Sequence, residues 1–198
     1  MTRHAERINL YDINSTRAGA IQRAEIASVA PAQEITGAWS VSFPPRWGAP
    51  EKITLDKLTS LSASTNAGVK YFSGTATYTT TFDWKPATEI GSPKSEFWLE
   101  LGEVQALAQI RLNGHDLGPV WLSPFRVNVT EVLRAGANAL EIRVANLWRN
   151  RMIGAAALPA PERFTRSSSA EFSPDTPLPK SGLIGPVVIR SMETVNLR

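Results

Sequence analysis

Apolar and polar residues alternate with a period of two along most of this chain, which is typical of β-strands that bury one face. In "ITGAWSVSF" the side chains of Trp39, Val41 and Phe43 fall on one face, and the turn residues of "PPRWGAP" follow. We therefore expect a folded β-sandwich domain to begin near Ile35 and to occupy residues 35–198.

The stretch before Ile35 has a different pattern. Residues 1–34 are polar to mildly apolar, and Pro31 interrupts a loosely helical spacing that is formed by Ala20, Ile21, Ala24, Ile26 and Ala27. We predict that residues 1–34 form a linker or a short helix.

Further along the chain, "KYFSGTATYTTTF" is rich in β-branched and aromatic residues, so it predicts a long strand, with a bulge at Gly74. The preceding "KITLDKLTSLSAS" fits either a strand followed by a loop or a helical turn. The pair Asn113–Gly114 is a strong hairpin signal, because both residues tolerate a positive φ.

The strand pattern continues to the end of the chain. In "ALEIRVAN" the period of two turns Leu140, Ile142 and Val144 inward, and Glu141 and Arg143 outward. "GPVVIRSM" supplies a final strand. Roughly eight turn-punctuated strands with no βαβ alternation predict an all-β fold, an antiparallel β-sandwich of jelly-roll type.

Composition and charge narrow the function classes. The chain has 198 residues with 42% hydrophobic content, enough for a sizeable core. Its 21 Lys and Arg are scattered among 18 Asp and Glu, so we expect no nucleic-acid partner. We also expect no membrane span and no signal peptide in this chain, because it has no long apolar run. Its localisation stays open, and a periplasmic or secreted parent protein is compatible with it.

Few residue types suited to metal or nucleophilic chemistry are present. The absence of cysteine rules out thiolate metal sites, and two histidines rule out a multi-histidine site. A Ser-His-Asp triad would need His115, which the hairpin is expected to expose. No acidic run has EF-hand spacing, so the sequence does not place a structural calcium ion. We predict no cofactor.

Glycoside hydrolysis needs two carboxyl groups about 5–9.5 Å apart in one pocket. The acidic residues that lie nearest to one another in the predicted sandwich are Glu100, Glu103 and Asp116, whereas Glu141 belongs to a solvated strand face. They do not predict a complete acid and base pair. Nucleotide-binding glycine motifs are absent as well.

The six tryptophans carry more information. Those within strands, Trp39 and Trp98, are expected in the core. Strand ends and loops carry Trp47, Trp84, Trp121 and Trp148. An indole beside Asn and Arg can stack on the apolar face of a sugar while the polar side chains bind its hydroxyls. The alternative is that these indoles close the open ends of the sandwich.

Several segments together resemble a known module: "YFSGTATY", "RLNGHDLGPVW", "NLWRNRMIG" and "SGLIGPV". Over residues 35–192 the chain is similar to the C-terminal sugar-binding-type β-sandwich of bacterial glycoside hydrolases of the α-L-rhamnosidase kind, and to the galactose-binding-like domains of β-galactosidase-type enzymes. In that family an acidic residue often follows "NLW.NR.IG", whereas this chain has Ala155.

The resemblance implies a non-catalytic carbohydrate-binding or accessory module, with the catalytic barrel outside this chain. If the module binds a plant or bacterial glycan, the expected contacts are Trp121, Trp148, Asn150 and Arg151, with Asn146 and Asp116 as outer polar contacts. The first alternative uses the same residues to pack on an adjoining catalytic domain without binding sugar. The second is a small stand-alone glycosidase, although we do not expect this chain alone to hydrolyse a glycoside.

Overall fold

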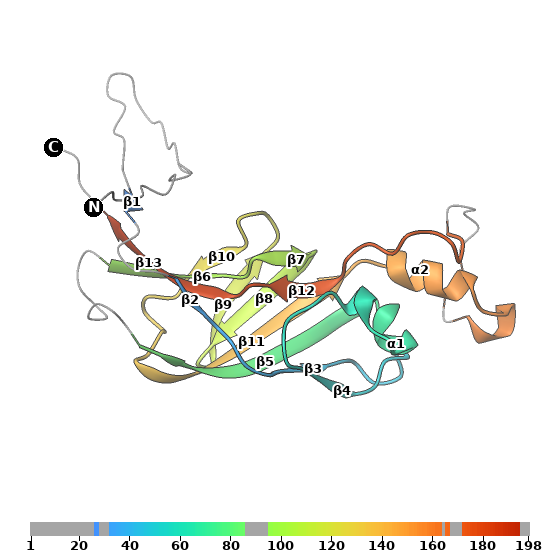
Figure 1. The fold of residues 1–198 in the computed structure, drawn as a ribbon, viewed down its shortest axis with the longest axis horizontal. Coiled ribbons are helices and arrows are strands. Elements are labelled where there is room, and N and C mark those ends of the chain that lie inside the picture. The colour runs from blue at the N-terminus through green and yellow to red at the C-terminus, as the bar shows by residue number, and fades with distance from the viewer. Residues whose placement is uncertain (1–25, 28–31, 86–94, 164, 167–171, 195–198) are drawn as a thin grey trace, which may run out of the picture.

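The computed structural model describes residues 26–27, 32–85, 95–163, 165–166 and 172–194. Expectations for the other residues, including most of the helix considered before Pro31, lie outside this part of the chain. The described residues form an antiparallel β-sandwich, with its strands running along the long axis of the molecule (Figure 1). The predicted all-β sandwich is confirmed.

One layer is a six-stranded sheet with the order β4-β3-β5-β11-β8-β9. Its longest members, β5 and β11, pair along all eleven residues from Gly74↔Asn146 to Trp84↔Gly136. The strands are β3 (Trp39–Ser42), β4 (Lys52–Leu55), β5 (Gly74–Trp84), β8 (Leu107–Leu112), β9 (His115–Val120) and β11 (Gly136–Asn146).

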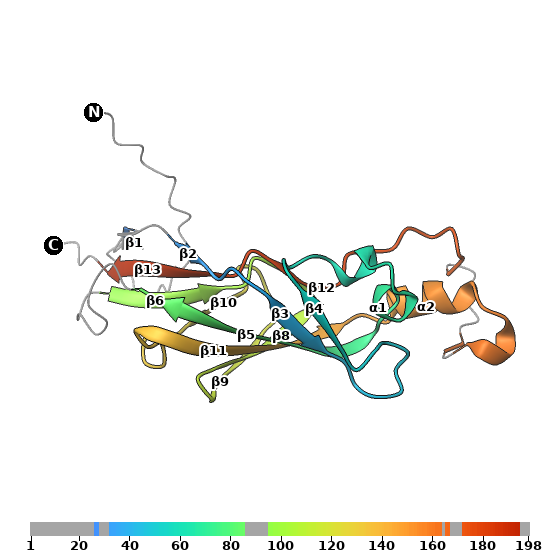
Figure 2. The same ribbon diagram turned by 60° about the horizontal axis from the view of Figure 1, so that its bottom comes forward.

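The facing layer is a five-stranded sheet in the order β1-β13-β6-β10, with β2 also pairing with β13. In Figure 2 strands β13, β6 and β10 lie above β11 and β9. The strands are β1 (Ile26–Ala27), β2 (Gln33–Glu34), β6 (Ser95–Glu100), β10 (Arg126–Asn128) and β13 (Val188–Thr194).

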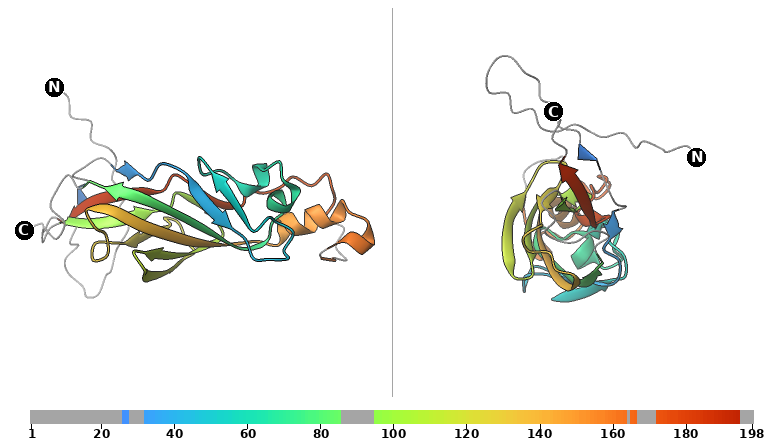
Figure 3. Two further views of the ribbon diagram at one scale, coloured as in Figure 1. Left: turned by 90° about the horizontal axis from the view of Figure 1, so that it is seen from below. Right: turned by 90° about the vertical axis from the view of Figure 1, so that its left-hand side faces the viewer.

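A small two-stranded sheet and four short helices complete the described elements. The sheet pairs β7 (Glu103–Gln105) with β12 (Gly182–Gly185). The helices are two 3-10 helices, η1 (Leu61–Ala63) and η2 (Ala160–Glu162), and two α-helices, α1 (Ala67–Lys70) and α2 (Arg149–Ala156). Both α-helices lie at one end of the sandwich, opposite β1 and the end of β13, and Figure 3 shows this end from below. We call this the α2 end.

The core is made by the inward faces of the two sheets. Tyr78 and Ile142 come from one sheet and Leu99 and Ile189 from the other, and all four are fully buried. Burying such side chains contributes about 1.5–3 kcal/mol each. The hydroxyl of Tyr78 accepts a hydrogen bond from the backbone N–H of Leu183 at 3.2 Å. Burial raises the pKa of this hydroxyl, an effect that the hydrogen bond partly offsets.

The expected strand faces are largely confirmed. Leu140, Ile142 and Val144 are buried, and the Asn113–Gly114 turn connects β8 to β9 with a positive φ at both residues. "KITLDKLTSLSAS" contains strand β4, a loop and η1, so the first of its two interpretations is closer.

Three local expectations are wrong. Gly74 starts β5 without a register shift, whereas register shifts occur between β8 and β9 and between β7 and β12. Ile26 and Ala27 form a strand, because they pair with β13. Trp98 lies outside the core with its ring 4.9 Å from the Arg126 guanidinium. Trp84 lies at a strand end as expected: it is the last residue of β5, and it is buried and packs edge-on against Phe97.

Candidate functional site

The segment "NLWRNRMIG" forms the junction between the six-stranded sheet and α2. Strand β11 ends at Asn146, and α2 begins at Arg149 with Trp148 as its N-cap. The sequence predicts only a strand exit here. The helix has no side-chain hydrogen bond at its N-cap, so the usual Ser, Thr, Asp or Asn signal for a helix start is absent.

Three polar side chains of this segment, Asn146, Asn150 and Arg151, face inward, whereas Arg149 is exposed. Asn146, Asn150 and Arg151 expose 7%, 3% and 6% of their surface. The amide of Asn146 donates to the backbone carbonyls of Gly74 at 3.2 Å and Val144 at 3.3 Å. These side chains therefore hold the junction together.

Arg151 and Asn150 join α2 to two other parts of the chain. The Arg151 guanidinium donates to the carbonyl of Trp47 at 2.5 Å, and the Asn150 amide donates to the carbonyl of Pro179 at 3.0 Å. Burial lowers the pKa of Arg151. An arginine nevertheless remains protonated, and a buried charge requires such hydrogen bonds.

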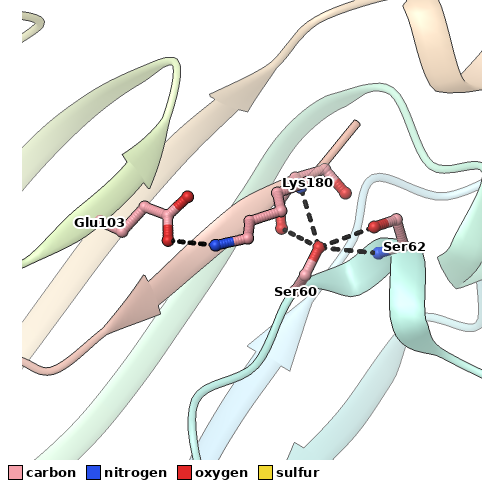
Figure 4. A network of polar contacts seen from close by, with 5 residues as sticks. Ser60, Ser62, Glu103 and Lys180 are labelled. Carbon is pink, nitrogen blue, oxygen red and sulfur yellow. Dashed lines mark hydrogen bonds and ion pairs between the residues drawn. The ribbon is translucent and has the colours of Figure 1, made fainter. Parts of the chain in front are cut away.

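The segment that receives Asn150 is itself fixed by a polar network (Figure 4). The hydroxyl of Ser60 accepts the backbone N–H of Ser181 at 3.0 Å and lies 2.8 Å from the hydroxyl of Ser62. Lys180 forms an ion pair with Glu103 at 2.7 Å. The contacts of α2 thus end on an anchored part of the sandwich.

Two glycines allow the elements at the α2 end to approach closely. A Cβ at Gly154 would lie 2.4 Å from Cγ of the Tyr71 ring, and a Cβ at Gly68 would lie 1.9 Å from the carbonyl oxygen of Gly48. Only glycine fits such contacts. They seat α2 on Tyr71, the C-cap of α1, and α1 on the loop that carries Trp47.

The apolar side chains of the same junction face outward. Leu147 is 62% exposed and Trp148 is 53% exposed. The Trp148 ring lies 5.9 Å from the Trp47 ring at an interplanar angle of 51°, and Trp47 is 37% exposed. We call Trp47, Leu147 and Trp148 the apolar cluster.

Two more exposed apolar residues occupy the same end of the sheet. Trp121 is 60% exposed and Leu122 is 70% exposed. Trp121 follows Val120, which pairs with Ala108, so its backbone continues beside Leu107. Leu107 in turn pairs with Ala145, next to the end of β11.

Asp116 lies away from the junction, on edge strand β9. Its carboxylate accepts hydrogen bonds from the backbone N–H of Gly118 at 2.9 Å and from the side-chain amide of Gln109. The hydrogen bond from Gly118 lowers the pKa of Asp116 most; desolvation opposes it, and the Gln109 hydrogen bond and the charges of Arg111 and Arg143 lower the pKa further.

The structure therefore does not gather the six predicted contact residues into one site. Trp121 and Trp148 are exposed at the same end, Asn146, Asn150 and Arg151 are buried, and Asp116 belongs to the outer face of a sheet. Sequence spacing gives no sign of which way the polar side chains point after β11 ends.

The carboxylates considered for catalysis lie apart. Glu100 belongs to the five-stranded sheet and pairs with Arg190 at 3.1 Å, whereas Asp116 belongs to the six-stranded sheet. Glu103 is bound to Lys180, and His115 is exposed in the hairpin. Within the described residues there is no group of three or more His, Cys, Asp or Glu that could hold a metal ion. No helix in this part of the chain is long and apolar enough to cross a membrane.

Comparison with known proteins gives one family and several relatives. A family model described as "Glycosyl hydrolase 2 galactose-binding domain-like" matches residues 60–178. The rhamnosidase from Novosphingobium sp. PP1Y is 40% identical, with a TM-score of 0.74, over 87% of this chain and 16% of that enzyme. A protein of Formosa agariphila named "Putative beta-glucuronidase" is 34% identical over 86% of this chain and 16% of its own length.

A more distant structure shows the same fold. The β-D-glucuronidase of Dictyoglomus thermophilum is 16% identical with a TM-score of 0.53, over 89% of this chain and 29% of that protein. The chain thus spans about 16% of the length of the two more similar relatives.

Proposed function

Since the chain belongs to the glycosyl hydrolase 2 galactose-binding-like family, we propose that it is a non-catalytic accessory domain of a larger glycoside hydrolase. In this proposal the domain packs on the catalytic part of the enzyme through its apolar cluster. The relatives supply the context for this proposal. Because the chain spans about 16% of the rhamnosidase, most of such an enzyme lies elsewhere in its polypeptide.

The observation that carries the proposal is that two polar side chains of the junction are buried while two apolar side chains are exposed. Asn150 and Arg151 point inward and are bound to backbone carbonyls, whereas Leu147 and Trp148 point outward. A loop that faces water is expected to have the opposite arrangement. A sugar site at the junction would need several polar donors at the surface, but Asn150 and Arg151 are already used, and of the polar side chains of the segment only Arg149 is exposed.

Contact with another protein domain explains the exposed Leu147 and Trp148 better than sugar binding does. Covering a leucine and a tryptophan contributes roughly 1.5–3 kcal/mol each, and tryptophan is enriched among the residues that dominate protein interfaces. The cluster also has a rigid base, because Arg151 ties α2 to the Trp47 loop and Gly154 seats it on Tyr71. A rigid surface loses little entropy when it binds.

A graft tests this proposal. Residues 1–198 replace the matching segment of the Novosphingobium rhamnosidase, and the thermal unfolding of the hybrid enzyme is followed by calorimetry. We expect one cooperative transition for the hybrid. The double substitution Leu147→Ser and Trp148→Ser should lower its Tm by several degrees, because about 3–6 kcal/mol of apolar contact is lost.

The isolated chain provides the control for folding. In it the same double substitution should change the Tm little, because both side chains already face water. Trp98→Ser, a substitution on the other sheet, should change the Tm by the same amount in the hybrid and in the isolated chain. A hybrid that tolerates the Leu147 and Trp148 substitutions as well as the isolated chain does would overturn the proposal.

A further inference from the structure

A second surface, on the outer face of the six-stranded sheet, has the features of a ligand site. Two hollows lie on this face, of about 280 Å³ and 680 Å³, and they share Arg111 and Glu141 in their walls. Together they are lined by residues of all six strands of this sheet, β9, β8, β11, β5, β3 and β4. The larger volume is within the usual range for small-molecule sites, and the smaller is near its lower limit.

The wall of the smaller hollow contains as many positively charged as negatively charged side chains. Its wall contains the guanidinium groups of Arg111 and Arg143 and the carboxylates of Asp116 and Glu141. Neither arginine forms an ion pair within 4.0 Å with another described residue. The hollow therefore offers strong donors and acceptors without the net positive charge that would select a phosphate or a polyanion.

A local irregularity of the sheet fixes one of these acceptors. The register shift between β8 and β9 places Asp116 opposite Arg111 and Gly118 opposite Ile110. The bulge turns the Gly118 N–H onto the Asp116 carboxylate, and the Gln109 amide holds it from the other side. β-Bulges commonly redirect side chains at functional sites. The acceptor is thus held in place before any ligand arrives.

Hydroxyl and apolar groups surround the charged residues. The larger hollow is lined by hydroxyl side chains, namely Ser40, Thr54, Thr79, Thr80 and Thr81. At the other end Leu107 and Ala145 give the smaller hollow an aliphatic wall, and the exposed Trp121 follows the strand that lies beside Leu107. Polar groups beside a flat apolar surface match a molecule with hydroxyls on its edge and C–H bonds on its faces.

We infer that this outer face binds a neutral carbohydrate, with Asp116 and Arg143 hydrogen-bonded to its hydroxyls and Trp121 at the end of the groove. We call this surface the sheet groove, defined by Gln109, Arg111, Asp116, Glu141 and Arg143. It is separate from the apolar cluster, whose residues do not line either hollow. The inference goes beyond the proposed docking function and does not depend on it.

Nuclear magnetic resonance of the isotopically labelled 198-residue chain tests the inference. The probes are xylohexaose, mannohexaose, methyl α-L-rhamnopyranoside and methyl β-D-galactopyranoside, each added to about 20 mM to detect millimolar affinity. We expect at least one neutral probe to shift the backbone signals of β8, β9 and β11 at the groove. Sodium galacturonate, added in parallel, should bind no more tightly.

Substitutions then assign the binding to side chains. Asp116→Asn and Arg143→Gln should each weaken binding of the active probe about tenfold, and Trp121→Ala should also weaken it. Asp83→Asn, an exposed carboxylate at the far end of β5, is the matched control and should leave binding unchanged. Well-dispersed spectra of each variant confirm that it is folded.

Three results would overturn the inference. One is the absence of shifts in the groove with every neutral probe. Another is binding of galacturonate alone, which would make the site anion-selective. The third is a set of shifts centred on Leu147 and Trp148, which would place the ligand on the apolar cluster instead.

Discussion

The guanidinium of Arg151 donates to the backbone carbonyl of Trp47 across 104 positions of sequence and so ties helix α2 to a loop that presents an exposed indole. This bond explains why an arginine is buried at the end of a β-sandwich. It also shows how the apolar cluster is built: a polar contact underneath holds two exposed tryptophan rings side by side.

Replacing this arginine should loosen the α2 end. Arg151→Met keeps most of the side-chain volume but removes the charged donor, and we expect a loss of about 1.5–3 kcal/mol in the free energy of unfolding. Urea denaturation measures it. Arg134→Met, at an exposed arginine in the turn before β11, is the control and should change stability by less than about 0.5 kcal/mol. Equal losses in the two variants would contradict the role of Arg151.

The close approach of Gly154 to Tyr71 gives a second prediction. An alanine at 154 would bring its Cβ to 2.4 Å from the ring. Gly154→Ala should therefore cost about 1–3 kcal/mol through overpacking, although alanine favours helices. Ala156→Ser, in the same helix at a half-buried position, should cost much less. A higher Tm for Gly154→Ala than for the unsubstituted protein would contradict the close packing of α2 on Tyr71.

A third prediction concerns the buried hydroxyl of Tyr78. Tyr78→Phe would leave the N–H of Leu183 without its acceptor, and we expect a loss of about 1–3 kcal/mol in urea denaturation. Tyr71→Phe serves as the comparison, because the Tyr71 hydroxyl forms no hydrogen bond with another residue in the described part of the chain.

The ionisation of Tyr78 can be followed as well. Its pKa is raised above the ordinary value of 10.0, so the folded state holds the phenol proton more tightly than the unfolded state does. The stability that this contributes is complete below pH 10 and declines as the pH rises further. In alkaline titration of the ultraviolet absorbance, one tyrosine should ionise only with unfolding. Ionisation of all tyrosines near their ordinary pKa in the folded protein would contradict the burial.

A fourth prediction concerns Asp116. Its pKa should lie below the ordinary value of 3.8, chiefly because the Gly118 N–H stabilises the carboxylate. The small stabilisation that follows is present above that ordinary value and is lost as the pH falls through the folded pKa. Carboxyl-carbon resonances measure this pKa directly. Gln109→Ala should move it upward, and an unchanged titration would show that the amide does not hold the carboxylate.

The sequence predicts the sheets well, because period-two alternation is a local property and each strand can be assigned a face independently. Glu141 and Arg143 are outward and Ile142 is inward, as expected. The core position expected for Trp98 follows from its residue type and not from the alternation. The period of two groups Trp98 with Glu96 and Glu100, opposite the buried Phe97 and Leu99, and the structure places it on that outer face.

The candidate site depends on contacts between distant residues. The sequence singles out the junction segment but does not reveal that Arg151 and Asn150 point inward, because their partners lie 104 and 29 residues away. It also does not reveal the sheet groove. The groove brings together residues from three strands, β8, β9 and β11, whose order in the sheet is β11-β8-β9 and not their order in the chain.

Docking through the apolar cluster is tested most directly by hydroxyl-radical footprinting of the isolated chain and of the rhamnosidase hybrid. We predict that Leu147 and Trp148 are oxidised readily in the isolated chain and severalfold more slowly in the hybrid, because a neighbouring domain covers them. Trp98, on the opposite sheet, should react at the same rate in both proteins. Equal oxidation of Leu147 and Trp148 in both would contradict docking through this surface.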